Sequence, residues 1–414
     1  MTALYLYDDE VARGFEPFAL TRPVGELRAG VELLRRRWER ATGAAAHGFV
    51  AAPHLADFAE FDAPPAVAGE LPAGAILANA RCAVALDAHA IGAAEGTERW
   101  TCDGRVAAVR LRAPLALERL ADGALPLEAL APEHAPTRAL RGWWLDAVWA
   151  LVGRLGAMLA DDIAVLGPTL VTAAHPGTVL GAHQVYVERG ATVEPHVVFD
   201  TTAGPVLLRR GATVQAFTRV VGPCAVGEHS VVVADRISGC SIGDVCRVHG
   251  EISASVVLGH ANKAHDGFVG HSYLGRWVNL GAGTTTSNLK NTYGTVALWT
   301  PEGVRDTAEQ FLGTLFGDHA RTGIGLRLTT GCVVGAGANV YDRMPPKLVP
   351  AFAWGAEAPY GRYDVEKFVA VAARAMARRQ VTLAAGAAAQ LRAAHARAGH
   401  RYGSGAGAAD RMVG

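Results

Sequence analysis

Residues 214–232 read VQAFTRVVGPCAVGEHSVV, and valine stands there at every sixth position. The same spacing returns along the chain in three further sets: Ile242 and Val248; Leu274 and Leu280; and Leu328, Val334 and Val340. In a hexapeptide-repeat solenoid, six residues form one short strand and one turn, so an aliphatic side chain points into a triangular prism at every sixth position. The period predicts a parallel β-helix across roughly residues 165–345.

The alternative is a β-sandwich rich in valine and glycine, which would show period-two alternation with turns about every 8 to 12 residues. The observed period of six favours the solenoid. Residues 298–312 break this period with Pro301, Glu302 and Asp306. We expect this segment to loop out of the coil, and such excursions often carry function.

The segment before the solenoid alternates strand and helix signals. Residues 4–7, 49–52 and 75–77 are β-prone or buried in character, and residues 143–159 have a helical character. An amphipathic helix that Gly43 would end is predicted after Pro23, because apolar residues recur there at steps of three and four: Val24, Leu27, Val31, Leu34 and Trp38. This alternation predicts an α/β layer.

Four parts are therefore expected. They are an α/β domain in residues 1–155, a β-helix domain in residues 156–356, a C-terminal helical segment in residues 357–398 and a disordered tail in residues 399–414. The helical segment is rich in alanine and arginine, and capping of the solenoid is its expected role.

Composition excludes several classes of partner. The 414 residues carry a net charge of zero and no basic run interleaved with aromatic residues, so we expect no nucleic-acid and no membrane partner. The six cysteines are scattered, which is typical of reduced thiols in the cytoplasm. No stretch of about 18 apolar residues is present. A soluble, cytoplasmic protein that binds small molecules is predicted.

The densest polar cluster is GHANKAHDG at residues 259–267, which is followed by His271. A histidine with a pKa near neutrality can take a proton from an amine, and a general base of this kind contributes about 10² to 10⁴ in rate. In NLGAGT, residues 279–284, small side chains expose backbone amides that can hold an oxyanion.

The run KAHDGFVGHSYLGRWVNLGAGTTTSN, residues 263–288, resembles the acetyltransferase domain of the GlmU family, the bifunctional enzymes that make UDP-N-acetylglucosamine. FALTRPVGELRAG, residues 18–30, and WWLDAVWALVGRLGAMLADDI, residues 143–163, resemble the variant with a short sugar nucleotidyltransferase-like N-terminal domain. The resemblance implies a left-handed β-helix, against the usual right-handed crossover. It also implies a homotrimer with sites between subunits.

Carried onto this sequence, the resemblance assigns the catalytic histidine to His265, with Phe268 in the place of the family's tyrosine. Asn279 and Asn288 match two asparagines that contact the amino sugar, and Ala282 supplies the oxyanion amide. Two phosphate-contacting positions depart from the family, since its lysine falls near Ser253 and its second tyrosine is Leu289. The expected substitutes are Lys263, Lys290 and Arg219.

The implied reaction moves the acetyl group of acetyl-CoA to the amine of glucosamine 1-phosphate or a related amino sugar. His265 would take the ammonium proton, the amine would attack the thioester, and the amide of Ala282 would stabilise the oxyanion.

The N-terminal domain departs further from a sugar nucleotidyltransferase, because the Gly-rich loop that cradles the triphosphate of UTP is missing. Arg22 and Arg28 are the candidate phosphate ligands that remain. The aspartate that holds Mg²⁺ in such enzymes would fall in ANAR, residues 78–81, where Asn79 and Arg81 stand instead. The sequence leaves two hypotheses open, a domain that turns over UTP with Mg²⁺ and a domain that only binds or supports.

Two other functions remain open at this point. A zinc-dependent hydratase, like the gamma-class carbonic anhydrases, would use His260 and His265 with His271 or His319 as metal ligands. A sugar-nucleotide-binding scaffold would need no catalytic residue.

Overall fold

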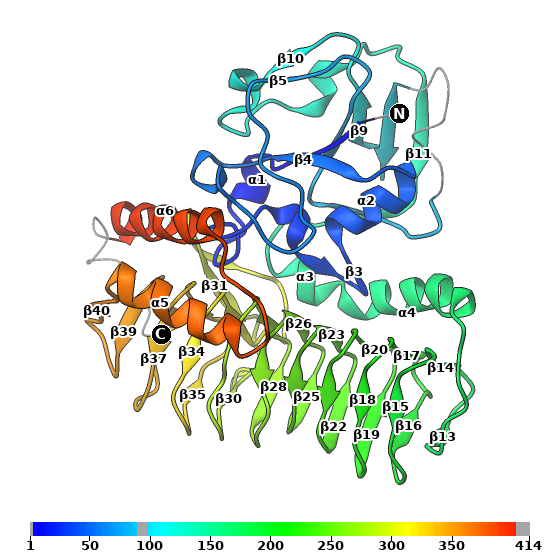
Figure 1. Cartoon of the computed structure of the whole chain (residues 1–414), viewed down its shortest axis with the longest axis vertical. Helices are drawn as coiled ribbons and strands as arrows, with labels where there is room; N and C mark the ends of the chain where they lie inside the picture. The colour runs from blue at the N-terminus through cyan, green and yellow to red at the C-terminus, as the bar shows by residue number, and fades with distance from the viewer. Residues whose placement is uncertain (1–2, 89–97, 403–414) are drawn as a thin grey trace. The chain divides into compact units, whose positions relative to one another are not determined.

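The computed structural model describes residues 3–88 and 98–402 (Figure 1). They divide into two compact units, Met1–Val148 with Ala384–Ala394 and Trp149–Leu383 with His395–Gly414. Among the described residues, no helix has both the length and the apolar character to cross a membrane. Of the tail predicted to be disordered, residues 399–402 complete a helix and residues 403–414 lie outside the described residues.

The first unit is built on a six-stranded sheet of order β11-β8-β9-β6-β1-β4. Its strands are β1 (Leu4–Tyr7), β4 (Ala46–Val50), β6 (Ile76–Asn79), β8 (Arg99–Cys102), β9 (Arg105–Arg110) and β11 (Thr137–Leu140). Smaller antiparallel pairs join β5 (Glu70–Leu71) to β10 (Leu115–Ala116) and β7 (Cys82–Val84) to β12 (Gly142–Trp144). β1 is parallel to both β4 and β6, so the residues that follow β1 and β6 meet at one edge of the sheet.

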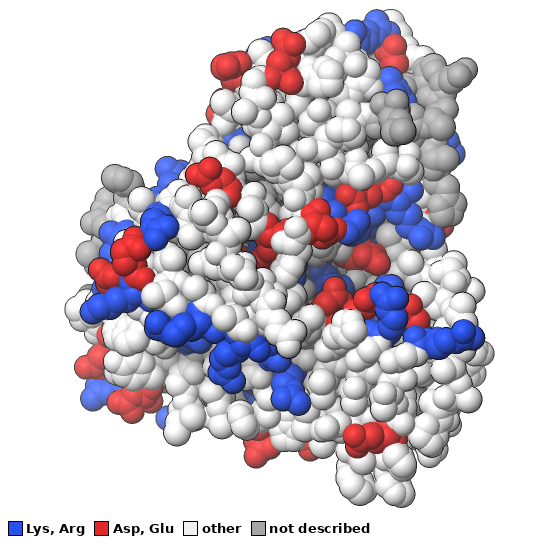
Figure 2. Space-filling model, viewed as in Figure 1, with Lys and Arg blue, Asp and Glu red and all other residues white. Residues whose placement is uncertain are grey.

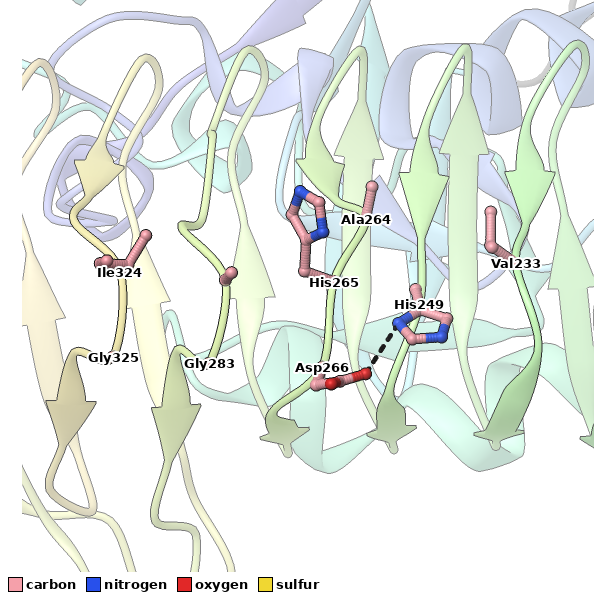
Figure 3. Close-up of a pocket in the computed structure, with 9 residues that line it drawn as sticks. Val233, His249, Ala264, His265, Asp266, Gly283, Ile324 and Gly325 are labelled. Atoms are coloured by element: carbon pink, nitrogen blue, oxygen red, sulfur yellow. Dashed lines mark ion pairs between the residues drawn. The ribbon is translucent and has the colours of Figure 1, made fainter.

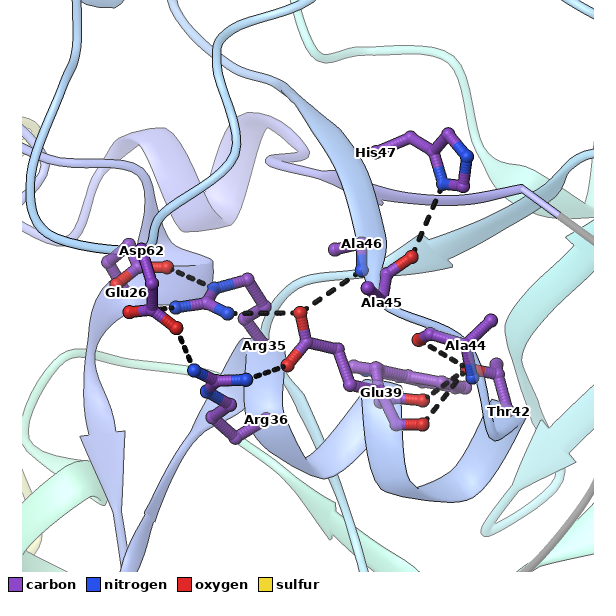
Figure 4. A network of polar contacts seen from close by, with 11 residues as sticks. Glu26, Arg35, Arg36, Glu39, Thr42, Ala44, Ala45, Ala46, His47 and Asp62 are labelled. Carbon is purple, nitrogen blue, oxygen red and sulfur yellow. Dashed lines mark hydrogen bonds and ion pairs between the residues drawn. The ribbon is translucent and has the colours of Figure 1, made fainter.

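The helix predicted after Pro23 is shorter than its apolar pattern. Residues 24–26 form a 3₁₀ turn, β2 (Arg28–Ala29) and β3 (Glu32–Leu33) form a hairpin, and only α2 (Leu34–Thr42) is helical. Gly30, at φ +64°, makes the hairpin turn that interrupts the helix, whereas Gly43, at φ +71°, ends α2 as predicted. A network of ion pairs then fixes α2, because the buried Arg35 guanidinium contacts Glu26, Glu39 and Asp62 (Figure 4).

Two other helix predictions need correction. Residues 143–159 begin as strand β12, because its backbone pairs with β7 and Trp144 donates its indole N–H to the carbonyl of Cys102; helices α3 (Ala150–Gly153) and α4 (Leu155–Leu166) follow. The predicted C-terminal helix is two helices, α5 (Val365–Ala377) and α6 (Ala385–Tyr402). Gln380, at φ +61°, lies in the break between them.

The second unit contains the predicted parallel β-helix, whose strands lie on three faces (Figure 1). Face 1 holds β13 (Thr178–Leu180), β16 (Val198–Asp200), β19 (Thr218–Val221), β22 (Asp235–Ser238), β25 (Glu251–Ser253) and β28 (Phe268–Gly270), next to which lies the pair β30 (Thr285–Thr286) and β35 (Arg327–Leu328). Face 2 holds β14 (Val185–Val187), β17 (Val206–Leu208), β20 (Cys224–Val226), β23 (Ser241–Asp244), β26 (Val256–Gly259), β29 (Tyr273–Leu274), β33 (Thr314–Phe316), β36 (Cys332–Val334) and β38 (Leu348–Val349). Face 3 holds β15 (Thr192–Val193), β18 (Thr213–Val214), β21 (Val231–Val232), β24 (Arg247–Val248), β27 (Asn262–Lys263), β34 (Arg321–Thr322), β37 (Asn339–Val340), β39 (Ala353–Gly355) and β40 (Gly361–Arg362).

The period-six residues form the core of this solenoid, which confirms the prediction. Each of the aliphatic residues that defined the period is at most 2% exposed: Val214, Val220, Val226, Val232, Ile242, Val248, Leu274, Leu280, Leu328, Val334 and Val340. All six cysteines are buried, and each keeps its thiol outside any disulfide.

The predicted excursion also leaves the coil. On face 2, Val256 pairs with Tyr273 after 17 residues, whereas Tyr273 pairs with Leu315 only after 42. The extra residues include an antiparallel hairpin, β31 (Ala297–Thr300) with β32 (Gly303–Asp306). The excursion returns beside its starting point, since Leu312 N–H donates to the carbonyl of Asn288 and Gly313 N–H to that of His271.

Candidate functional site

The prism has three corners, and the predicted site residues are distributed among them. We call them the His265 corner, between faces 3 and 1; the His271 corner, between faces 1 and 2; and the Trp277 corner, between faces 2 and 3. Each name refers to the turn residue that lies between the strands of those faces, such as His265 between β27 and β28.

At the His265 corner, turns of successive coils line a pocket of about 760 Å³ (Figure 3). Its lining residues are Val233, His249, Ala264, His265, Asp266, Ala282, Gly283, Ile324 and Gly325. The predicted base His265 and the predicted oxyanion residue Ala282 therefore share one pocket. The His265 side chain is exposed.

Three further residues at this corner were not predicted. His249 Nε2 lies 3.2 Å from Asp235, and His249 Nδ1 lies 3.5 Å from Asp266. Within the described ranges, this trio is the single group of three side chains whose donor atoms are close enough to share a metal ion. The signal was their spacing, because β21, β24 and β27 pair in successive coils and each of the three residues follows one of these strands.

Lys263 is not placed where it can bind a substrate phosphate. It is 1% exposed, and its ammonium donates to the backbone carbonyls of His249, His265 and Asp266. Burial lowers the pKa of Lys263 to about 8, while Asp266 and Asp235 act in the opposite direction. The hexad position explains this orientation, because Lys263 pairs with Val248 in the core-facing column of face 3.

At the His271 corner lie Phe268 and Asn288, two residues that are predicted to act together with His265. His271 Nδ1 lies 2.8 Å from Asn288 Nδ2, and its ring stacks on Phe311 at 5.2 Å. Gly270 makes this packing possible, since a Cβ there would come within 2.4 Å of the Phe268 ring and 2.7 Å of Asn288 Nδ2. Phe268 and Asn288 thus meet beside His271. Burial lowers the pKa of His271, which favours the neutral imidazole near pH 7.

His271 was predicted only as an alternative zinc ligand, because the spacing of the resembling family assigns the catalytic base to His265. Its signal was again the coil length, since His271 and Asn288 are 17 residues apart. Phe311 could not be found in this way, because the excursion delivers it from outside the repeat.

The other predicted residues of the solenoid lie apart from these groups. Asn279 is on face 3, where its Oδ1 accepts a hydrogen bond from Asn262 Nδ2 at 3.1 Å. Lys290 belongs to the excursion. Burial lowers the pKa of Lys347, and the charge of Lys290 lowers it further. Arg219 forms an ion pair with Asp200 at 2.6 Å.

The histidines of the zinc hypothesis do not form a ligand set. His260 packs on Trp277 with ring centroids 4.4 Å apart, and Trp277 stacks on His319 at 6.3 Å, all at the Trp277 corner. His265 and His271 occupy the other two corners. Among the described residues, no group of three metal-capable side chains contains any of these four histidines.

In the first unit, the two predicted phosphate ligands have protein partners. Arg22 is 2% exposed and forms an ion pair with Glu60 at 2.7 Å. Arg28 is also buried, and its guanidinium donates to the carbonyl of Val31. Neither arginine is presented to a ligand at the surface.

Asn79 and Arg81, which stand where such enzymes have their Mg²⁺-binding aspartate, form hydrogen bonds and ion pairs with neighbouring carboxylates. Arg81 Nε lies 2.8 Å from Asp9, Arg81 Nη1 lies 2.8 Å from Asp146, and Arg105 also contacts Asp146 at 2.8 Å. Asn79 donates to Asp9 at 2.8 Å. Because guanidinium groups already bind both carboxylates, these residues do not fit Mg²⁺, which requires free oxygen ligands.

Charged side chains of both signs are interspersed on the face shown in Figure 2, with a row of basic side chains along and below α5. Burial, with Arg247 and Arg378, lowers the pKa of Arg379, which follows α5.

Comparison with known proteins gives one family model for the first part of the chain and several curated relatives. The family model described as sugar nucleotidyl transferase matches residues 4–168. The bifunctional protein GlmU of Desulfitobacterium hafniense is 28% identical over 243 residues, covering 51% of this chain and 50% of that protein. The chain is similar to GlmU.

The GlmU protein of Gluconobacter oxydans is 32% identical over 128 residues, covering 30% of this chain and 28% of its own length. A bifunctional sugar-1-phosphate nucleotidylyltransferase/acetyltransferase of Sulfurisphaera tokodaii is 32% identical over 91 residues, covering 22% and 23%. The chain thus spans half or less of the length of these curated relatives. The predicted resemblance to GlmU, with a nucleotidyltransferase-like N-terminal domain, is confirmed.

Proposed function

We propose that the solenoid is an N-acetyltransferase that moves acetyl from acetyl-CoA to the amine of glucosamine 1-phosphate or a related amino sugar. The observation that carries this proposal is the contact of His271 with Asn288, walled by Phe268 and Phe311. GlmU-like relatives support the reaction class, in the synthesis of UDP-N-acetylglucosamine. They favour it over a zinc hydratase.

His271 is the better candidate for the base, in place of His265. Its burial favours the neutral imidazole. With the Asn288 amide turned so that its Oδ1 accepts from Nδ1–H of His271, Nε2 of the ring is the nitrogen that accepts a proton from the substrate ammonium. The freed amine attacks the thioester carbonyl, and the resulting oxyanion is held by a backbone amide such as that of Ala282. The attacking nitrogen loses its second proton to solvent, the intermediate collapses with cleavage of the carbon–sulfur bond, and the imidazolium returns the first proton to the CoA thiolate.

One copy of the chain does not bring all these groups together, because His271 and Ala282 lie at different corners of the prism. We therefore propose that the site forms between copies of the chain, in a homotrimer. The His271 corner of one copy would face the pocket at the His265 corner of the next. Size-exclusion chromatography with light scattering tests this assembly, and a monomer that is fully active would contradict it.

For the N-terminal domain we propose binding of UTP or a sugar nucleotide without turnover. The family match supports a sugar-nucleotide ligand, and the occupied carboxylates of Asp9 and Asp146 argue against catalysis with Mg²⁺. A cytoplasmic location is proposed as well, since acetyl-CoA and UTP are supplied there.

The deciding experiment incubates the protein with acetyl-CoA, glucosamine 1-phosphate, UTP and Mg²⁺, and measures CoA and pyrophosphate separately. Release of CoA without pyrophosphate is expected. Pyrophosphate release would show that the N-terminal domain is a catalyst, and the absence of CoA release would contradict acetyl transfer. Stoichiometric zinc in protein purified without added metal would restore the hydratase hypothesis.

A further inference from the structure

Lys263 occupies a core position that otherwise belongs to aliphatic residues. In the column on face 3, Val214 pairs with Val232, Val232 with Val248, and Val248 with Lys263. A buried ammonium costs several kcal/mol unless hydrogen bonds compensate for its lost hydration. A lysine in this column therefore calls for a role that valine or leucine cannot fill.

The ammonium connects two successive turns of the His265 corner. It donates to the carbonyl of His249 in one turn, at 3.3 Å, and to those of His265 and Asp266 in the next, at 3.0 Å for Asp266. Both turns line the pocket. A single cation inside the prism thus fixes the backbone of two pocket walls.

This arrangement decides where the amides of the turn point. In a trans peptide, the N–H of each residue points opposite to the carbonyl that precedes it. Because the carbonyl of His265 points to the ammonium, the N–H group of Asp266 points away from it, out of the prism. The carbonyl of Asp266 is shared between the ammonium and Gly283 N–H of the next coil. Within the described chain, Asp266 N–H donates to no other backbone group, so this amide can bind an acceptor oxygen.

We propose that Lys263 is a positioning residue, which holds the His265 turn so that the amide of Asp266 binds a carbonyl oxygen of the acyl donor. This inference rests on the proposed acetyl transfer. The charged or titratable groups nearest the ammonium are Asp235, His249 and Asp266, and the two aspartates favour its protonated form.

The test compares Lys263→Met, Lys263→Arg and, as a matched control, Val248→Ala, which disturbs the same column without touching the carbonyls. Amide hydrogen exchange of residues 264–267 is measured in the full-length protein, beside acetyl transfer with acetyl-CoA as the varied substrate. In Lys263→Met, the hydrogen-exchange rate in this segment should rise about tenfold, and KM for acetyl-CoA about five- to tenfold. The reason is that the turn loses the net stabilisation of roughly one hydrogen bond. The value of kcat and the KM of the amino sugar should change less than about twofold, and Lys263→Arg should restore most of the loss.

The pH dependence of KM for acetyl-CoA separates the charge of Lys263 from its packing, because a loss of packing alone would not depend on pH. In the wild type, KM for acetyl-CoA should rise above about pH 8 as the ammonium loses its proton, and in Lys263→Met it should stay flat.

The outcomes separate the two proposals. Unchanged exchange in Lys263→Met would overturn the positioning role, and so would an equal rise of KM in Val248→Ala. A wild type that transfers no acetyl group would overturn the proposed function, while the exchange measurement would still decide the role of Lys263.

Discussion

Two clusters of polar side chains, one in each unit, differ in what they leave available to a ligand. In the first unit, Asp9, Arg81, Asp146 and Arg105 neutralise each other, and the two arginines also lie 4.9 and 4.0 Å from the ring of Trp144. At the His271 corner, the imidazole contacts the Asn288 amide through Nδ1, and burial favours its neutral form.

The difference teaches that similar residue types can be arranged for stability or for chemistry. Ion pairs that are saturated within the protein hold a fold but offer no free charge to a substrate. A partly buried histidine with a lowered pKa is neutral near pH 7 and can take up a proton. We therefore assign catalysis to the solenoid, and the experiments below test that assignment from the largest expected effect to the smallest.

The largest effect is expected for His271→Ala. Loss of a general base should lower kcat for acetyl transfer by about 10² to 10⁴, with the melting temperature little changed. Initial rates of CoA release measure it. The matched control is His265→Ala, for which we expect less than a tenfold loss because its ring is exposed. If His265→Ala causes the larger loss, the base is His265 and the comparison between the clusters must be redrawn.

Asp8 lies next to the first-unit cluster. Its ionisation should destabilise the fold, whereas the ionisation of an ion-paired aspartate stabilises it. Burial raises its pKa to about 7, against the hydrogen bond from Val24 N–H. The folded state therefore holds the proton more tightly than the unfolded state, and stability is lost as pH rises from about 4 to 7. Asp8→Asn should be more stable than the wild type at pH 8, by up to about 4 kcal/mol.

Thermal unfolding from pH 4 to pH 8 measures this effect. The advantage of Asp8→Asn should shrink as the pH falls below 7 and vanish near pH 4. An advantage that is independent of pH would show that folding does not shift the pKa of Asp8.

Arg81→Ala tests whether the first-unit cluster is structural. Removing the guanidinium leaves the Asp9 carboxylate, 17% exposed, without its cation, which should lower the free energy of unfolding by about 3 kcal/mol. Arg105→Ala is the control, because its side chain is 41% exposed and its loss should matter by less than about 1 kcal/mol. Acetyl transfer should be unchanged in both variants. A parallel loss of CoA release would contradict the division of roles.

Most of the solenoid could be predicted from the sequence because its six-residue period corresponds directly to one strand and one turn of a coil. Every hexad residue is buried where the period placed it, and the break at residues 298–312 is the excursion. The same regularity explains the unpredicted pairs, since His271 with Asn288 and His249 with Asp266 are each 17 residues apart. Their contacts depend on coil length, which a pattern of six does not give directly.

The first unit was less predictable because local patterns met competing tertiary interactions there. Residues 24–33 carry helical periodicity, yet a Gly30 turn and pairing of β2 with β3 produce a hairpin. Trp143 and Trp144 joined a strand for a similar reason. The inward orientation of Lys263 was also not predicted. Its charge favours a phosphate ligand, whereas its position in the repeat places it in the core.

The smallest effect is expected for Phe311→Ala, which tests whether burial at the His271 corner sets the pKa of the catalytic histidine. The Phe311 ring covers His271, and burial is the cause of the lowered pKa of that histidine. Activity should fall as the pH drops through this pKa, because the protonated imidazole cannot accept a proton. Opening the corner to water should move that acidic limb upward, toward the ordinary histidine value. It should lower kcat near pH 6 by up to about fourfold and change it little at pH 7, where an imidazole of ordinary pKa is still mostly neutral. Phe217→Ala is the matched control, since Phe217 stacks on His196 at 5.5 Å elsewhere on the solenoid and should leave the pH–rate profile unchanged. If the limb stays in place in Phe311→Ala, the burial of His271 does not set the protonation state that the reaction uses.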